Sequence, residues 1–134
     1  MSIATIRDGL ATNLQTITGL RATGDITDNP TPPIAIVQLN RVEYDGAFNK
    51  GLTTYNFVIS VVVGRASERT AQDRLNAFAT PSGASSIKLA VQSDRTLGGS
   101  AYDVRVSEMQ NIGAVLLGGE SYLAADFAVQ VYAN

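Results

Sequence analysis

Residues 53–78 constrain the fold of this chain more than any other stretch, because they predict a strand followed at once by a helix. From residue 55 to residue 63, alternate positions place two aromatic and three β-branched side chains on one face. The opposite face is mixed at first and apolar toward its end. A period of two is the signature of a strand, and such side chains suit a pleated, packed surface. Because both faces can be largely buried, we expect residues 54–64 to form a central strand with a neighbour on each side.

The helix predicted after this strand covers residues 67–79. Ser67 is placed to accept hydrogen bonds from the free amides of its first turn, and Glu68 complements the positive start of the helix. Ala71, Leu75 and Phe78 follow at helical spacing. They form one apolar stripe, which we expect to lie against the sheet.

An N-terminal helix is predicted at residues 2–18, because large apolar residues recur there at steps of three and four. Gly9 in its middle costs up to about 1 kcal/mol relative to alanine. Five large apolar residues should outweigh that cost, since each buried aliphatic side chain contributes roughly 1.5–3 kcal/mol. These residues are Ile3, Ile6, Leu10, Leu14 and Ile17.

Three further strands are predicted at residues 34–40, 100–109 and 122–132. A short helix is predicted at 85–93, capped by Ser85 or Ser86. The order of these elements predicts a single α+β domain over residues 1–134. Its sheet should be four-stranded, mostly antiparallel, and packed against the N-terminal and central helices.

Three segments of the chain show no clear helix or strand pattern. Residues 21–33 contain three prolines and predict turns or extended backbone without a regular element. Residues 40–53 and 111–121 combine glycines with polar residues in lengths that exceed ordinary hairpin loops. We expect these last two segments to be mobile, protruding arms.

Composition excludes several functions. Cysteine and histidine are absent, which removes thiolate chemistry, the usual general base near neutral pH and the commonest metal ligand. The formal net charge is −2 and the ten basic residues are scattered, so we expect no recognition of nucleic acid and no binding to a membrane. The longest apolar run, at residues 57–63, is far shorter than the ~20 residues of a membrane helix. No signal peptide pattern is present, so we expect a soluble intracellular protein.

Three groups of residues could in principle form a catalytic or metal-binding site, but each is better explained as ordinary solvent-exposed residues. A serine–lysine pair at Ser85 or Ser86 with Lys88 is conceivable, but such a lysine usually lies in solvent. An acidic group in the loop at 25–29 lacks the ligand spacing and closing glutamate of a calcium loop. Paired carboxylates, which glycosidases use, lie on the wet faces of predicted strands: Asp103 with Glu108, and Glu120 with Asp126. We therefore predict no catalytic, cofactor-binding or metal-binding residues.

Several short motifs, taken in order, are similar to those of one protein family. The N-terminal helix is followed by Pro32-Pro33-Ile34-Ala35-Ile36-Val37 and Tyr44-Asp45-Gly46. Val61-Val62-Val63-Gly64-Arg65 then leads into a Ser-Glu-Arg helix start. The later motifs are Pro81-Ser82-Gly83-Ala84-Ser85-Ser86-Ile87, Leu97-Gly98-Gly99 and Tyr122-Leu123-Ala124-Ala125. Over nearly the whole chain this order resembles the tail terminator, or tail completion, proteins of long non-contractile-tailed bacteriophages.

This resemblance implies a structural virion protein without catalytic residues. Related proteins form a ring, a hexamer, on the head-proximal end of the tail tube, where they stop tube growth and provide the head-joining surface. The implied partners are further copies of the chain, the major tail tube protein and a head-completion or neck protein. The implied location is the virion tail, after synthesis in the host bacterial cytoplasm.

If the chain forms such a ring, we expect the two arms to carry its contacts. The expected apolar anchors are Phe48, Val115, Leu116 and Leu117, and the expected polar rim is Glu43, Asp45, Lys50 and Glu120. The alternative is a small ligand-binding or enzymatic α+β domain with a pocket between its sheet and its helices.

Overall fold

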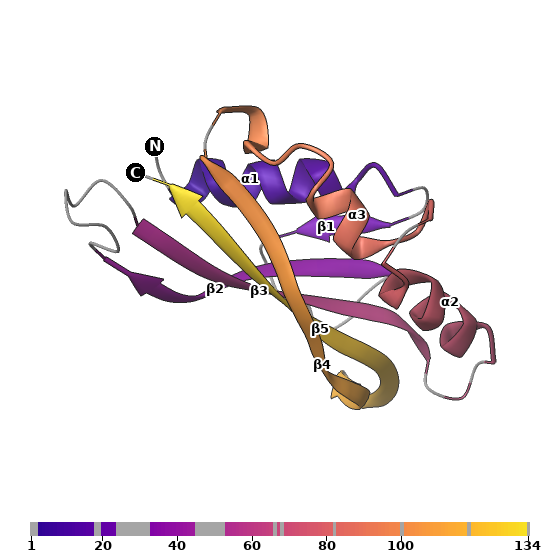
Figure 1. Cartoon of the computed structure of the whole chain (residues 1–134). Helices are drawn as coiled ribbons and strands as arrows, with labels where there is room; N and C mark the ends of the chain where they lie inside the picture. The colour runs from indigo at the N-terminus through magenta and orange to yellow at the C-terminus, as the bar shows by residue number, and fades with distance from the viewer. Residues whose placement is uncertain are drawn as a thin grey trace.

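The computed structural model of the chain describes residues 3–17, 20–23, 33–44, 53–65, 67, 69–81, 83–99, 101–117 and 119–133, with Thr23 and Leu117 described by their backbone alone. The elements follow in this order (Figure 1): α1 (Ile3–Leu14), β1 (Arg21–Thr23), β2 (Ile34–Glu43), β3 (Thr53–Arg65), α2 (Arg69–Ala79), α3 (Ile87–Val91), the 3-10 helix η1 (Leu97–Gly99), β4 (Asp103–Leu117) and β5 (Glu120–Ala133). This order confirms the predicted α+β class.

Five strands form one sheet in the order β1-β2-β3-β5-β4. β1 runs parallel to β2, and the other three neighbouring pairs are antiparallel. The strand predicted to be central, β3, pairs with β2 on one side and with β5 on the other. The sheet is therefore mixed and mostly antiparallel, as the alternation along β3 and the two C-terminal strands predicts.

The prediction of four strands was wrong by one, because Arg21–Thr23 forms β1 beside β2. Three residues are too few to show an alternating pattern, and prolines follow them closely in the sequence. The pairing itself makes this segment a strand. Its first backbone amide, on Arg21, donates to the carbonyl of Pro33 at 3.2 Å, and Ala22 packs against the core.

The prediction of a loop at residues 111–121 was also wrong. β4 continues through this segment to Leu117, and β5 begins at Glu120. Glycines usually interrupt strands, but Gly113 lies inside β4 next to a register shift, where an irregularity in the ladder suits a residue without a side chain. The expected second arm is therefore formed mainly by the paired strands β4 and β5.

The first expected arm is shorter than predicted. β2 continues to Glu43 and β3 begins at Thr53, so both strands extend into the segment 40–53. The rest of that arm, including Asp45, Phe48 and Lys50, lies outside the described residues.

The three helices lie on one face of the sheet and bury a single main core against it (Figure 1). The face of β3 that alternation predicts to be apolar supplies Phe57, Ile59, Val61 and Val63, all buried. The predicted stripes of α1 and α2 face it and are also buried: Ile6, Leu10, Leu14, Ala71, Leu75 and Phe78. Apolar periodicity therefore identifies the helix-facing side of each element.

Ser86 caps α3, which confirms one of the two predicted candidates. Its backbone is extended, with φ −67° and ψ 121°, and its hydroxyl oxygen accepts a hydrogen bond from the amide of Leu89 at 3.1 Å. This hydrogen bond satisfies one amide that has no partner within the helix.

Gly9 lies where α1 approaches η1. A Cβ atom at this position would be 2.8 Å from Cβ of Leu97 and 3.2 Å from its carbonyl oxygen. Both distances are too short for undisturbed packing, so a side chain here would force the two elements apart. Gly9 therefore lowers the helix propensity of α1 but allows α1 to pack closely against η1.

Replacing Gly9 with alanine should lower the free energy of unfolding, although alanine is the better helix former. Helix propensity would add about 1 kcal/mol of stability, whereas overpacking typically costs about 1–3 kcal/mol. We expect a net loss of roughly 1 kcal/mol, measured by urea unfolding. Gly113→Ala is the control, because no atom lies within 4 Å of its Cβ position. A higher unfolding midpoint for Gly9→Ala would contradict the close approach of α1 and η1.

Candidate interaction surface

β4 and β5 form a two-stranded ribbon that extends beyond the rest of the sheet (Figure 1). β5 pairs with β3 only as far as Tyr122, which lies opposite Arg65. Beyond that point β5 pairs with β4 alone, down to Leu117 opposite Glu120. In the turn, Gly119 has a φ of 83°, a left-handed conformation that favours glycine. Within the described part of the chain, the end of the ribbon thus has no neighbouring strand on either side.

A bulge in β4 is held by side chains on the face of the sheet away from the helices. Asn111 has a φ of 56°, a conformation that asparagine tolerates better than most residues. Its Nδ2 donates to Oδ2 of Asp126 in β5 at 3.0 Å. The other oxygen of Asp126, Oδ1, accepts from the hydroxyl of Ser60 in β3 at 2.8 Å. One carboxylate of β5 therefore connects the bulge in β4 on one side with β3 on the other.

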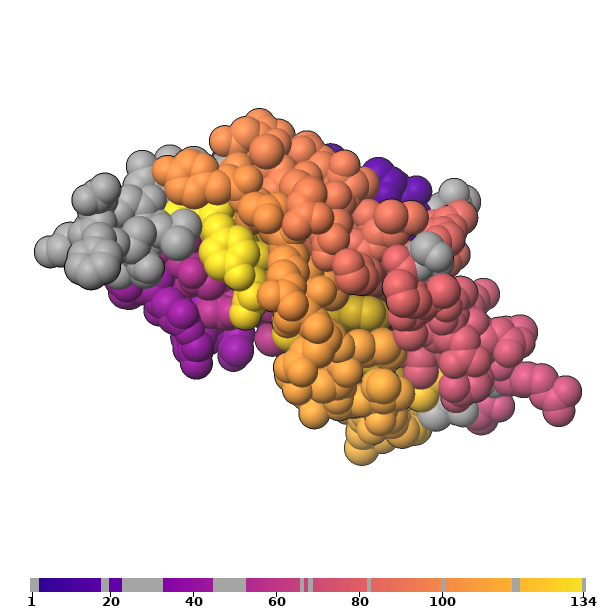
Figure 2. Space-filling view, viewed as in Figure 1, coloured from indigo at the N-terminus to yellow at the C-terminus, as the bar shows by residue number. Residues whose placement is uncertain are grey.

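The end of the ribbon exposes apolar side chains, and we call Ile112, Val115, Leu116 and Glu120 the ribbon tip. Leu116 is 73% exposed, Ile112 59% and Val115 38%. Val115 pairs with Tyr122 and Leu116 with Ser121, so these two consecutive side chains lie on opposite faces of the ribbon. Figure 2 shows the distal part of β4 at the surface, in the orange region at the bottom of the view. The predicted anchors Val115 and Leu116 are thus both accessible, whereas the side chain of Leu117 lies outside the described part.

A charged pair borders the ribbon tip. Nε of Arg65 lies 3.0 Å from Oε2 of Glu120, and both side chains are about half exposed. Such a pair contributes little to stability because solvent screens it. Glu120 was predicted as part of the rim, but Arg65 was not, since only the register of β3 on β5 brings it there.

The predicted rim residue Glu43 lies far from the ribbon tip. It pairs with Thr54 at the start of β3, whereas Arg65 and Glu120 lie where β3 ends. Glu43 forms an ion pair with Arg41, and the neighbouring Tyr44 is largely exposed. The structure therefore divides the predicted contact residues between opposite ends of the sheet.

The sheet face away from the helices is polar at one end and apolar at the other. A cavity of about 220 Å³ crosses all four long strands and is lined mainly by polar side chains: Asn40, Arg41, Asn56, Ser107, Glu108, Gln110 and Gln130. Within the described residues, Nδ2 of Asn56 is buried there without a hydrogen-bond partner. Toward the ribbon, Ile34, Val62, Tyr122 and Ala124 form a second buried cluster. A neighbouring cavity of about 180 Å³ is lined partly by Val115, so the ribbon tip continues into this apolar end.

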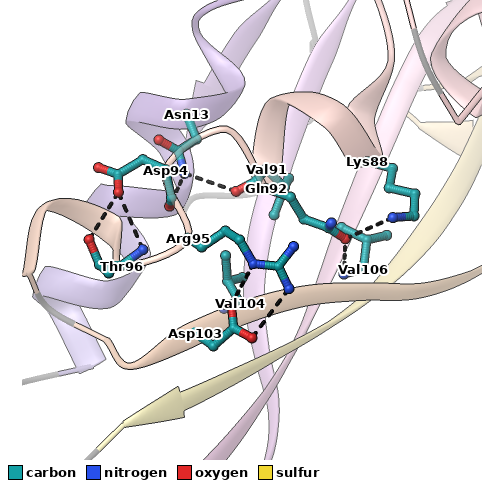
Figure 3. A network of polar contacts seen from close by, with 10 residues as sticks. All are labelled: Asn13, Lys88, Val91, Gln92, Asp94, Arg95, Thr96, Asp103, Val104 and Val106. Carbon is teal, nitrogen blue, oxygen red and sulfur yellow. Dashed lines mark hydrogen bonds and ion pairs between the residues drawn. The ribbon is translucent and has the colours of Figure 1, made fainter.

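A polar network joins α1, α3, η1 and the first half of β4 (Figure 3). Nδ2 of Asn13, which is buried, donates to the carbonyls of Val91 and Asp94 at 3.0 and 3.1 Å. Oε1 of Gln92 accepts from the backbone amide of Val106 at 3.1 Å and from Nζ of Lys88 at 3.1 Å. These hydrogen bonds fix the helical layer to one part of β4. Sequence inspection missed Asn13, although a polar residue within the apolar stripe of α1 was a visible signal.

Two carboxyl groups in this network have lowered pKa values. Hydrogen bonds from the Thr96 hydroxyl and from the Gly98 backbone hold the pKa of Asp94 below its usual value. A hydrogen bond from Arg95, whose Nε is 2.7 Å from Oδ1 of Asp103, lowers the pKa of Asp103. The same contact raises the pKa of Arg95. Both carboxylates are therefore held in the charged form by local donors.

The residues considered above as candidates for a catalytic site make other contacts in the structure. Ser86 caps α3 and Lys88 donates to Gln92. Asp103 and Glu120 pair with arginines rather than with the carboxylates considered as their partners. The acidic group at 25–29 lies outside the described residues. Elsewhere in the described chain, no group of three or more acidic, histidine or cysteine residues could hold a metal ion. No helix in the described part is long and apolar enough to cross a membrane.

No protein-family model matches the chain, and no curated protein is significantly similar to it.

Proposed function

We propose that this chain is a phage tail terminator: a non-catalytic virion protein that caps the head-proximal end of the tail tube as a ring, stops tube growth and provides the surface that joins the head. The observation that carries this proposal is the ribbon tip. It holds exposed apolar side chains on both faces of a ribbon that belongs to a well-packed sheet. The order of motifs that resembles the tail terminator family supports the specific assignment.

The ribbon tip has the make-up of a protein interface. Interfaces typically place apolar side chains at their centre and polar or charged ones at their edge. Leu116 and Ile112 provide the apolar centre, and the Arg65–Glu120 pair provides a charged edge. A leucine that is 73% exposed favours association, because burying it against a partner removes apolar surface from water.

The two ends of the sheet suit a ring. A head-to-tail ring requires two different surfaces on each subunit, because one surface binds the neighbour on one side and the other surface binds the neighbour on the other side. The ribbon tip lies at one end of the sheet, and Arg41, Glu43 and Tyr44 lie at the other. Each subunit therefore offers two unlike exposed regions for its two neighbours.

The proposal includes the partners and the location that the family resemblance implies. The ring, a hexamer, would contact the major tail tube protein on one side and a head-completion or neck protein on the other. The subunits would be made in the host bacterial cytoplasm and end in the virion tail. Neither nucleic-acid recognition nor membrane binding is part of this role.

The alternative function, a ligand-binding or enzymatic domain, would need a pocket between the sheet and its helices. A cavity at that place is lined by residues of α2, α3, β4 and β5, among them Lys88, Met109 and Phe127. Its volume is about 160 Å³, below the roughly 300–1,000 Å³ of typical ligand sites. This difference favours the structural role.

Tail assembly in a phage that lacks this chain tests the proposal. Supplying the wild-type chain should restore tails of normal length that join heads. The double variant Val115→Ser/Leu116→Ser should melt within a few degrees of the wild type, because both side chains are partly or largely exposed. It should nevertheless give overlong tails or tails without heads, visible by electron microscopy.

The matched control is Leu89→Ser, which removes a half-exposed leucine from α3, an element that lies beside the other half of β4 and away from the ribbon tip. It should restore assembly like the wild type. Normal, head-joining tails built from the double variant would refute the role of the ribbon tip. Normal tails in the complete absence of the chain would refute the terminator function itself.

A further inference from the structure

The last five residues of β4 form an open edge of the sheet. β4 is an edge strand, paired with β5 on one side only. In an antiparallel ladder every second residue directs its amide and carbonyl away from its partner strand. Along residues 113–117 these groups face no other strand among the described residues. We propose that this segment pairs antiparallel with the same segment of a second copy, giving a two-fold dimer of the free chain.

The first half of the same edge is closed by side chains (Figure 3). The amide of Val106 donates to Gln92 of α3 at 3.1 Å. The amide of Val104 donates to Oδ1 of Asp103 at 2.9 Å. β4 then shifts its register between Val106 and Glu108 and again between Gln110 and Gly113. Bulges and side-chain capping both prevent an edge from pairing with another strand.

Residues 113–117 lack this protection. Their sequence is Gly-Ala-Val-Leu-Leu, with no charge and no proline, and they pair with β5 without a register shift. Lysine, proline and bulges are the usual means by which edges avoid pairing. The contrast lies within one strand: the half beside α3 is capped, and the half at the ribbon tip is open.

The side chains of this segment fit a second copy of themselves. A two-fold axis at Val115 sets Val115 opposite its equivalent and Leu116 opposite the small Ala114. Large residues thus lie opposite small ones on one face of the ribbon. On the other face, Tyr122 and Val115 of one copy and the same two residues of the second copy form a continuous row of side chains across the four strands. Because the segment is uncharged, no like charges meet. The other edge of the sheet, β1, is only three residues long and begins with an arginine, so it offers a poorer partner.

The dimer does not depend on the proposed function. A two-fold contact closes on itself, whereas a ring requires a head-to-tail contact, so the two associations are different. Both would bury Val115 and Leu116. The dimer is therefore a form of the free chain at high protein concentration, and it must separate before those residues can contact a neighbour in a ring.

The test uses charges at the symmetry axis. Five residues per copy make a small contact compared with the roughly 1,200–2,000 Å² of stable interfaces, so we expect a weak dimer that forms at high protein concentration. Sedimentation or light scattering should then give the wild type twice the mass of one chain. Val115→Lys and Val115→Glu should each be monomeric, because each places like charges opposite one another. An equimolar mixture of the two should regain the doubled mass.

Tyr102→Lys is the matched control, since it adds a charge at an exposed site just before the capped end of β4, and it should dimerise like the wild type. Melting temperatures close to that of the wild type will show that all variants fold. A wild type that stays monomeric at the highest concentration would overturn the proposal. The open edge of β4 would then be available only to a strand of a different protein. A mixture of the lysine and glutamate variants that stays monomeric would overturn it as well.

Discussion

Val61→Asp should leave the chain unable to fold. Val61 is fully buried in the middle of β3, opposite Ala35 of β2 and Ala125 of β5, which are buried as well. A carboxylate at this position would lose its hydration among apolar neighbours, at a cost of several kcal/mol even after relaxation. Domains of this kind are stable by only about 5–15 kcal/mol. We expect insoluble protein, or soluble protein without a cooperative melting transition by circular dichroism.

Val58→Asp is the matched control, because it makes the same change three residues away on the opposite face of β3. Val58 is only partly buried and lines the polar cavity together with Arg41, so this variant should fold with a smaller loss. Asp103→Ala should also fold, since the ion pair with Arg95 that it removes is half exposed. A Val61→Asp chain that stays soluble and melts cooperatively would contradict the buried, central position of β3.

Asn13→Ala should lower the free energy of unfolding by roughly 1–3 kcal/mol. The buried carbonyl of Val91 would lose its Asn13 donor, whereas the carbonyl of Asp94 would keep a hydrogen bond from the amide of Leu97. The Asn13 amide supplies hydrogen bonds to two carbonyls, those of Val91 and Asp94, almost eighty residues away in sequence. Without that amide, the end of α3 and the start of the next turn lose these two hydrogen bonds to α1 and are held to it by apolar packing. Urea unfolding is the measurement, with a lowered midpoint and an unchanged slope as the expected result.

Two variants separate this hydrogen-bonding role from simple packing. Asn13→Asp keeps the size and shape of the side chain but replaces its two donors by acceptors, so it should lose at least as much stability as the alanine variant. Thr12→Ala removes the adjacent, exposed hydroxyl, which bonds only within α1, and should change stability by less than about 0.5 kcal/mol. Asn13→Asp unfolding at the wild-type midpoint would show that the two hydrogen bonds contribute nothing.

Sequence patterns identified the parts of the fold that depend on local periodicity. The apolar face of β3 and the stripe of α1 emerge from spacing alone, and so does the cap at Ser86. Patterns failed where pairing between distant segments decides the structure. β1 is a strand only because β2 lies beside it. The glycines in residues 111–121 predict an interruption of the strand, yet residues 113–117 remain extended because they pair with β5.

In the candidate interaction surface, too, residues that are close in sequence could be predicted, and residues brought together by strand pairing could not. Val115, Leu116 and Glu120 are close in sequence, so their proximity in space could be predicted. Arg65 completes the charged edge only through the pairing of β3 with β5, a contact between residues more than fifty positions apart. Glu43 lies at the opposite end of the sheet from Glu120, because antiparallel pairing places the end of β2 beside the start of β3. Spacing along the sequence does not show this separation.

The position of β5 has a consequence for synthesis of the chain on the ribosome. β5 is made after the other four strands of the sheet, yet it is not at an edge but lies between β3 and β4, and it contributes Phe127, Val129 and Val131 to the core. Until residues 120–133 have emerged, β3 lacks one of its two neighbours and β4 has none. A nascent chain therefore keeps one edge of β3 unpaired until β5 has been made, and unpaired strand edges favour aggregation. Folding must be completed late, through contacts between distant segments that form slowly.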